Sequence, residues 1–181
     1  MESIVVIGVM AVIMLVISQI FLLNYEMFWK QSLRSGNETG AILASRTISQ
    51  LARSAADVEA SHVFGGTTRT SSDTQLVLKL PSIDGTGSLI FNTYDYVAFY
   101  RDATATTKIF SVTEAGSGSV RKSGTRLVTA YNAALYFRYN NPDVTKADRV
   151  SVMLINQQTR RGTSVTSRAW TSIFLRDYKS T

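Results

Sequence analysis

The chain has 181 residues, a formal net charge of +6 and no cysteine. This length accommodates one domain of about 100–150 residues with an appendage. The lack of cysteine excludes a disulfide framework, a thiolate nucleophile and a thiolate metal site. A single histidine, His62, leaves a histidine-based metal site short of ligands. The positive charge suits contact with an anionic surface such as lipid, nucleic acid or cell wall, but it does not indicate a fold.

The chain opens on a long apolar segment. No charged residue lies between Ile4 and Leu23, and Glu2 stands directly in front of this run. About 20 helical residues span about 30 Å, the hydrocarbon thickness of a membrane. No basic stretch precedes the run and no small-residue cleavage site follows it, which favours a retained membrane segment over a signal peptide. A buried core helix of a soluble protein is the alternative.

The helical pattern continues past the apolar run. Apolar residues recur at three- and four-residue steps and form one stripe: Ile48, Leu51, Ala52, Ala55 and Val58. The segment Ser35–Gly40 contains two glycines and is the expected weak point. No proline occurs before Pro81, and Gly65–Gly66 provides an end signal. We therefore predict one long helix over residues 1–64.

This predicted helix divides into two parts. Residues 1–30, apolar on every side, form a membrane or filament-core segment. Residues 41–64 form an amphipathic part that packs on a sheet, because the apolar stripe needs an apolar partner and a sheet face in this chain can provide it.

From residue 67 onward the apolar period changes from helical to alternating. Runs rich in β-branched and aromatic residues predict strands over residues 74–81, 94–102, 108–114, 126–140, 149–157 and 164–178. Turn residues such as those of PSIDGTGS and NNPD separate these runs. Short turns between neighbouring strands indicate a mostly antiparallel sheet. The predicted fold class is α+β, with the long helix packed on a β-rich head domain over residues 67–181.

Few residues of the head point to chemistry. The stretch Ile83–Ser88 (IDGTGS) lacks the spaced acids of an EF-hand and the Lys-Ser/Thr of a P-loop, so we interpret it as a hairpin turn. His62 falls near the expected helix end, where a solvated or capping role is usual. No spacing groups the aspartates, and we predict neither a catalytic site, a cofactor nor a metal.

Basic residues gather in or beside turns of the head. They could form a surface for nucleic acid or polysaccharide, although solvated turns are the more frequent reason for such residues. The candidates for surface binding are Arg160, Arg161, Arg126 and Lys122.

The opening Met1-Glu2-Ser3-Ile4-Val5-Val6-Ile7 resembles the N-terminus of type IV pilins and of the pseudopilins of type II secretion. In that family a glutamate precedes about 20 apolar residues, and Glu2 matches it. SRTISQLARSAADVEASHVF is similar to the second helix half of minor pseudopilins of the J type. LVLKLPSIDGTGSLIFNTYDYVAFYRD, ALYFRY and SVTSRAWTSIFLRDY are similar to the β-domain of such proteins, so the resemblance covers most of the chain.

One part of the family's pattern is absent from this sequence. The processing glycine, the basic leader and the first three mature residues do not precede Met1. We expect a gene start placed at an internal methionine or a trimmed product, in preference to an unprocessed protein. Without a leader, Lys30 and Arg34 would hold the head in the cytoplasm by the positive-inside rule, so a lost basic leader makes the orientation sensible.

The resemblance implies a structural subunit, pilin or pseudopilin, of a helical filament of identical or related subunits. Glu2 would pair with the N-terminal amine of a neighbour, and Gly8 would loosen the helix in the bundle. The residues expected in filament assembly are Glu2, Ile4, Val5, Ile7, Gly8, Val12, Leu15, Ile20 and Phe21. The implied partners are the inner membrane, a prepilin peptidase and the assembly machinery, with extracellular DNA or a host or cell surface as further possibilities.

Two other hypotheses stay open. One is a single-pass anchored β-domain that binds a ligand or partner without polymerising. The other is a membrane-anchored enzyme, which no catalytic constellation supports. Glu2 discriminates the first hypothesis from the filament, because an anchor has no use for this carboxylate and a filament needs it.

Overall fold

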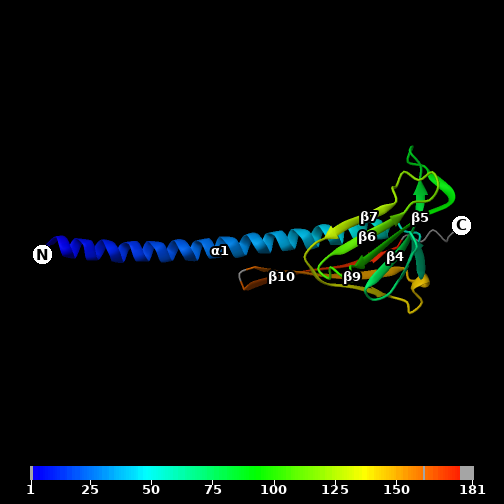
Figure 1. Cartoon of the computed structure of the whole chain (residues 1–181). Coiled ribbons are helices and arrows are strands. Elements are labelled where there is room, and N and C mark those ends of the chain that lie inside the picture. Colours follow the sequence, from blue (N-terminus) through cyan, green and yellow to red (C-terminus); the bar gives the residue numbers. More distant parts are fainter. Residues whose placement is uncertain (1, 161, 176–181) are drawn as a thin grey trace.

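The computed structural model describes residues 2–160 and 162–175. Helix α1 (Glu2–Arg53) is 52 residues long, so it extends for about 78 Å at 1.5 Å per residue. A β-rich head packs around its C-terminal half, and its N-terminal half projects alone from the head (Figure 1). This confirms the predicted α+β class, with one long N-terminal helix packed on antiparallel sheets.

The strands of the head form two larger sheets and one hairpin. The five-stranded sheet has the order β1-β4-β5-β6-β7 and the three-stranded sheet the order β10-β9-β8. All described strand pairs are antiparallel. The elements are β1 (Asp57–Val58), β2 (Ser61–Phe64), β3 (Thr67–Thr70), β4 (Gln75–Ile83), β5 (Leu89–Arg101), β6 (Ile109–Glu114), β7 (Gly124–Thr129), β8 (Asn132–Tyr139), the short 3-10 helix η1 (Val144–Lys146), β9 (Arg149–Arg160) and β10 (Thr163–Phe174).

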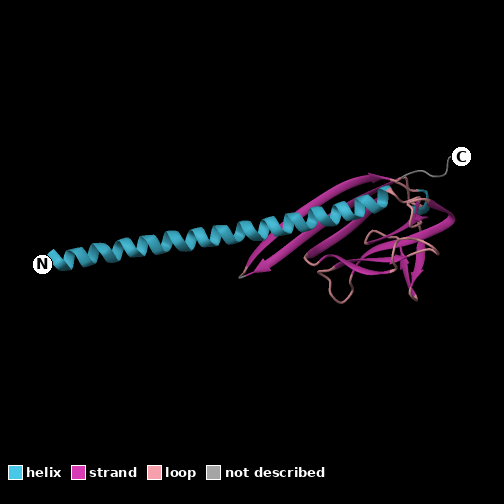
Figure 2. Cartoon of the chain, turned by 90° about the horizontal axis from the view of Figure 1, so that it is seen from above, coloured by secondary structure: helices cyan, strands magenta, loops and turns pink. Residues whose placement is uncertain are grey.

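The C-terminal half of α1 packs chiefly on β9 and β10, which run alongside it (Figure 2). Its buried side chains are mostly small and follow a helical stripe: Asn37, Ala41, Ala44, Ile48 and Ala52. Ile48 and Ala52 confirm the predicted stripe. Alanines along this stripe let the helix axis approach the sheet closely.

The glycines of residues 35–40 do not interrupt the helix. α1 continues through Gly36 and Gly40 without a break. A Cβ on Gly40 would lie 3.4 Å from Nδ2 of Asn156 on β9, an ordinary van der Waals contact. Gly40 therefore faces the sheet, and packing of the helix against the head offsets its low helix propensity.

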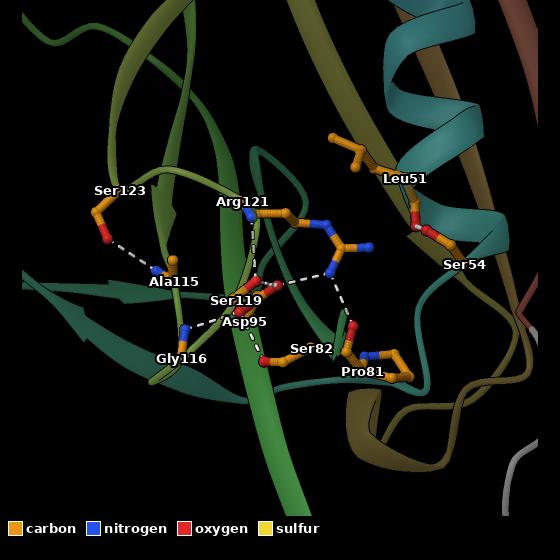
Figure 3. A network of polar contacts seen from close by, with 10 residues as sticks. All are labelled: Leu51, Ser54, Pro81, Ser82, Asp95, Ala115, Gly116, Ser119, Arg121 and Ser123. Atoms are coloured by element: carbon orange, nitrogen blue, oxygen red, sulfur yellow. Dashed lines mark hydrogen bonds and ion pairs between the residues drawn. The ribbon is translucent and has the colours of Figure 1, made fainter. Parts of the chain in front are cut away.

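The predicted helix end at residue 64 is wrong, because α1 ends at Arg53. The Ser54 hydroxyl donates to the Leu51 carbonyl at 2.9 Å and closes the last turn (Figure 3). The chain then forms β1, which pairs with β4, and the β2–β3 hairpin around Gly65–Gly66. Both glycines have positive φ, +53° and +87°, as a tight hairpin turn requires.

The spacing of Ala55 and Val58 predicted a longer helix because both residues are buried in the same core as the helix stripe. Ala55 lies in the turn that follows the helix, where its amide donates to the Ala52 carbonyl, and Val58 lies in β1, which pairs with β4. Burial periodicity over so few residues does not separate a last helical turn from a short strand.

The hydrophobic core lies between α1 and the inner faces of both large sheets. Leu76, Leu78 and Leu80 alternate inward from β4, as predicted. Beside them in the same sheet, Val97 and Phe99 come from β5. The other sheet contributes Val150, Val152 and Leu154 from β9. The turn predicted at Ile83–Ser88 joins β4 to β5, and Oδ1 of Asp84 accepts hydrogen bonds from the Thr86 and Ser88 amides.

The predicted single strand over residues 126–140 is divided into β7 and β8, which belong to different sheets. The change occurs at Tyr131 and Asn132. The Asn132 amide side chain donates to the carbonyls of Ala134 and Ile155, and the Tyr131 carbonyl accepts from the Gln157 amide. These bonds satisfy polar groups where the chain crosses between sheets, which a continuous β-rich composition does not disclose.

Ile48 tests the helix–sheet contact. Its side chain is fully buried, so Ile48→Ala should lower the free energy of unfolding of the head by about 2–5 kcal/mol through lost burial and a residual cavity. Urea unfolding of the full chain in mild detergent, followed by circular dichroism, measures this. The control Ile42→Ala removes the same atoms from a half-exposed position of the same helix and should change it by less than about 1 kcal/mol. Equal losses in both variants would contradict the packing described.

Candidate functional site

The bare half of α1 is the most unusual surface of the chain. Every side chain from Val5 to Phe28 is exposed, although the segment is strongly apolar. Its mean hydropathy reaches 2.8 over a membrane-length window, none of which is buried. By length and composition this helix can cross a membrane. An apolar surface of this extent on all sides of a helix requires lipid or apolar neighbours.

The residues predicted to act in filament assembly lie on this bare segment. Val5, Ile7, Val12, Leu15, Ile20 and Phe21 are all exposed. A Cβ on Gly8 would have no atom within 4 Å, so nothing in the monomer requires a glycine there. The backbones of Glu2 and Ile4 belong to α1, but their side chains lie outside the described part of the structure.

The bare segment ends at Trp29, the first side chain that the head partly covers. The Arg160 guanidinium, at the end of β9, lies 4.7 Å from the centroid of the Trp29 ring. Along the helix surface, Lys30 pairs with Glu26 at 2.8 Å and Arg34 with Glu38 at 2.9 Å. The helix therefore changes from apolar to charged just where the head begins.

The basic residues predicted to bind at the surface are not gathered into one patch. Arg160 lies at the β9–β10 turn, whereas Lys122 belongs to the β6–β7 connection at the opposite end of the head (Figure 1). Arg126 is exposed in β7, between these ends. Arg161 lies outside the described residues.

A surface that sequence reasoning missed is the outer face of the three-stranded sheet. Tyr136, Met153 and Trp170 form one row across β8, β9 and β10, because Met153 is the register partner of both others. Trp170 is 75% exposed. The alternation of residues 164–178 was a usable signal, because it places Trp170 and Phe174 on the same face.

Arginines accompany these aromatic side chains. Arg138 and Arg149 line the same shallow groove, of about 820 Å³, as Tyr136 and Trp170. The Arg149 guanidinium lies 5.8 Å from the Phe174 ring centroid. Among the described lining residues of this groove there is no carboxylate. The outer face thus combines exposed rings with uncompensated positive charge.

His62 does not cap a helix, contrary to expectation, because it lies in strand β2. Its ring stacks on Tyr96 at 3.7 Å, and its Nε2 is 3.3 Å from a Glu114 carboxylate oxygen. These contacts fasten the β2–β3 hairpin to the five-stranded sheet. Within the described residues, no group of three or more histidine or acidic side chains is placed to hold a metal ion.

Asp95 forms a buried polar centre that its sequence spacing did not reveal (Figure 3). Its Oδ1 accepts hydrogen bonds from the Ser82 hydroxyl and the Gly116 amide, each at 2.7 Å. Its Oδ2 accepts from the Ser119 hydroxyl at 2.8 Å and from Nη1 of Arg121 at 2.6 Å. Arg121 also donates to the Pro81 carbonyl. The carboxylate thereby ties the β6–β7 connection to β4 and β5.

The electrostatics of Asp95 follow from these contacts. Burial acts to raise the pKa of this carboxyl, but the hydrogen bonds from Arg121, Ser82, Gly116 and Ser119 together outweigh it and lower the pKa below its usual value. Gly116 is required for this arrangement, since a Cβ there would lie 2.6 Å from the Thr93 side chain. Both carboxylate oxygens are engaged by donors from this chain, so the network acts in structure.

This chain was compared with known protein families, curated sequences and solved structures. No family model, no curated protein sequence and no solved structure matches it. The architecture itself is pilin-like: a long apolar N-terminal helix whose second half packs against antiparallel β-sheet. An apolar N-terminal helix of this kind is typical of membrane association or secretion.

The Asp95 network makes the stability of the head dependent on pH. The folded pKa lies below the unfolded value of about 4, so the carboxylate stabilises the fold above pH 4 and this contribution is lost as the pH falls towards the folded pKa. At pH 7, Asp95→Asn should lower the free energy of unfolding of the head by about 1.5–3 kcal/mol, which is the range for hydrogen bonds to a charged group.

The cost of Asp95→Asn relative to wild type should shrink as the pH falls below about 4. Urea unfolding from pH 7 to pH 3 measures this difference. The control Asp73→Asn neutralises an exposed carboxylate and should change stability little at either pH. A cost of Asp95→Asn that stays constant across this range would show that the charge is not what the network stabilises.

Proposed function

We propose that this chain is a structural subunit, pilin or pseudopilin, of a type IV pilus-like filament. The observation that carries the proposal is the bare segment Val5–Phe28, which is apolar on all sides up to Leu23 and joined without a break to a folded head. A simple anchor would also be apolar. The unbroken helix also couples the two parts mechanically, because a force that pulls on the head is transmitted to the membrane segment.

Assembly follows physically from this shape. In a membrane, lipid tails cover the exposed valines, isoleucines and leucines of α1. In a filament core, the same side chains would be covered by equivalent helices of neighbouring subunits, so the helix leaves lipid without exposing apolar surface to water. The heads would then form an outer layer beginning at the level of Trp29.

Glu2 would set the register of this assembly. A carboxylate in an apolar core is costly unless it is paired. An N-terminal amine of an adjacent subunit would neutralise Glu2 only at the correct axial step, so subunits in other registers would carry an unpaired charge. The pairing is inferred from the family resemblance.

The proposal implies a path through the cell. The precursor would reside in the inner membrane, be processed by a prepilin peptidase, and pass through a pilus assembly machinery. Its destination would be an extracellular filament or an envelope-spanning pseudopilus. Contact with extracellular DNA or with a host or cell surface would belong to the exposed heads, and no cofactor is needed.

A second candidate function is a membrane-anchored β-domain that binds a partner without polymerising. The outer face of β8, β9 and β10 favours it, because Tyr136, Trp170 and Phe174 are exposed there beside Arg138 and Arg149. Exposed rings beside arginines on a sheet are suited to a ligand with flat faces and negative charge. In a filament this same face would be available between heads.

Glu2 distinguishes the two functions. Glu2→Ala should abolish filaments and leave the amount of protein in the membrane unchanged, because the carboxylate is needed only for register. Electron microscopy of filaments sheared from the source cells measures assembly, and mass spectrometry of the N-terminal peptide shows whether residues precede Met1. The control Glu26→Ala removes an exposed acid whose pair with Lys30 contributes little, and should assemble.

If Glu2→Ala cells make as many filaments as the wild type, the register role of Glu2 is wrong. If neither the wild type nor the variants make filaments and the protein stays in the membrane, the anchored β-domain is the correct function.

A further inference from the structure

Strands β9 and β10 extend beyond the rest of their sheet. They are 12 residues each, whereas β8 reaches along β9 only as far as the pair Asn132–Asn156. Beyond that pair, residues 157–160 and 163–166 have each other as strand partners, apart from the hydrogen bond that the Gln157 amide donates to the Tyr131 carbonyl. This two-stranded piece, the tip ribbon, runs along α1 towards its bare half (Figures 1 and 2).

The tip ribbon is fastened to the helix at two levels. Nδ2 of Asn37 donates to the Val165 carbonyl at 2.8 Å, and Asn37 is fully buried. Further towards the membrane segment, the Arg160 guanidinium covers the Trp29 ring at 4.7 Å. These two contacts fix the position of the ribbon along the axis of α1, and Arg160 lies at the level of Trp29.

This level along α1 can be compared with the layers of a bilayer. The apolar run ends at Leu23, and Trp29 follows six residues later, about 9 Å further along the helix. The headgroup layer of one leaflet is about 5–8 Å thick, the difference between the full bilayer and its hydrocarbon core shared over two sides. With the apolar run in the hydrocarbon, Trp29 and Arg160 therefore lie just beyond the headgroup layer, on the water side of its boundary. The long Arg160 side chain can reach lipid phosphates from there.

The composition of the ribbon suits this layer and not an apolar partner. Its described side chains are glutamines, threonines, a serine, one valine and Arg160. Lys30 and Arg34 each have a glutamate partner on the helix, whereas none of the described carboxylates pairs with Arg160. A groove of about 880 Å³ beside it is lined by Leu33, by Arg101 and by polar residues of the ribbon.

We infer that Arg160 is a headgroup anchor: it binds the phosphates of anionic phospholipids while its other face rests on Trp29. Guanidinium groups bind phosphate through paired N–H donors, and tryptophan favours the same interfacial depth. This contact would hold the head at a fixed height and rotation before assembly. Because a filament core holds no headgroups at this level, extraction would have to break it.

The inference rests on the membrane location within the proposed function, but not on polymerisation. The test uses the full chain in nanodiscs of phosphatidylcholine, with or without phosphatidylglycerol. The chain has no cysteine, so Thr159→Cys provides a single site for a nitroxide spin label on the ribbon. The electron paramagnetic resonance spectrum then reports the ratio of immobilised to mobile label. Cofractionation with the nanodisc reports insertion separately.

In discs with phosphatidylglycerol the label should be mostly immobilised and shielded from a water-soluble relaxation agent. Arg160→Gln should lower the immobilised-to-mobile ratio about five-fold, the factor for one basic side chain at an anionic surface, and high salt should do the same. The matched control Arg46→Gln removes the same charge from an exposed position of α1, 17 residues beyond Trp29 and away from the bilayer, and should leave the ratio unchanged.

Three outcomes would overturn the inference. Equal spectra in both lipid compositions would show that headgroup charge is not sensed. An equal effect of Arg160→Gln in both compositions would show that Arg160 acts only through Trp29. An equal effect of Arg46→Gln would show that the spectrum responds to the net charge of the chain and not to Arg160 itself. A chain that does not insert would contradict the membrane stage of the proposed function as well, whereas loss of filaments in cells would leave this inference intact.

Discussion

The seam between the C-terminal half of α1 and strands β9 and β10 is the contact on which the rest of the structure depends. Small side chains on one helix stripe, such as Ala41 and Ala44, let the sheet approach closely. The stripe buries Ile48 in the core that β4 and β5 complete. Because this seam holds the helix rigidly, the orientation of the head determines where the bare half points.

The same helix must satisfy two environments. Residues 5–28 are exposed in the monomer, and the buried stripe of residues 37–52 belongs to its core. A helix can do this because its backbone hydrogen bonds are internal in both surroundings. Only the side chains change along its length, so the transition from lipid-type surface to core-type stripe needs no break in the chain. Trp29, with Arg160 above it, stands at that transition.

Polar groups decide the details of the head more than its apolar pattern does. Asp95 gathers Ser82, Gly116, Ser119 and Arg121 from segments far apart in the sequence and joins a long connection to two strands. Asn132 satisfies the backbone where the chain leaves one sheet for the other. Such groups are costly when buried without partners, so each of them restricts the head to one arrangement.

The sequence by itself determined the fold class, the bare apolar helix and the inward alternation of Leu76, Leu78 and Leu80, because these follow from local periodicity and composition. The end of α1 at Arg53, the split of residues 126–140 and the aromatic row through Trp170 were decided only by tertiary structure. In each case the deciding partner lies far away in the chain: β4 for β1, Ile155 for Asn132, and Met153 for Trp170. Periodicity reports which side of a segment is buried, but not which distant segment buries it.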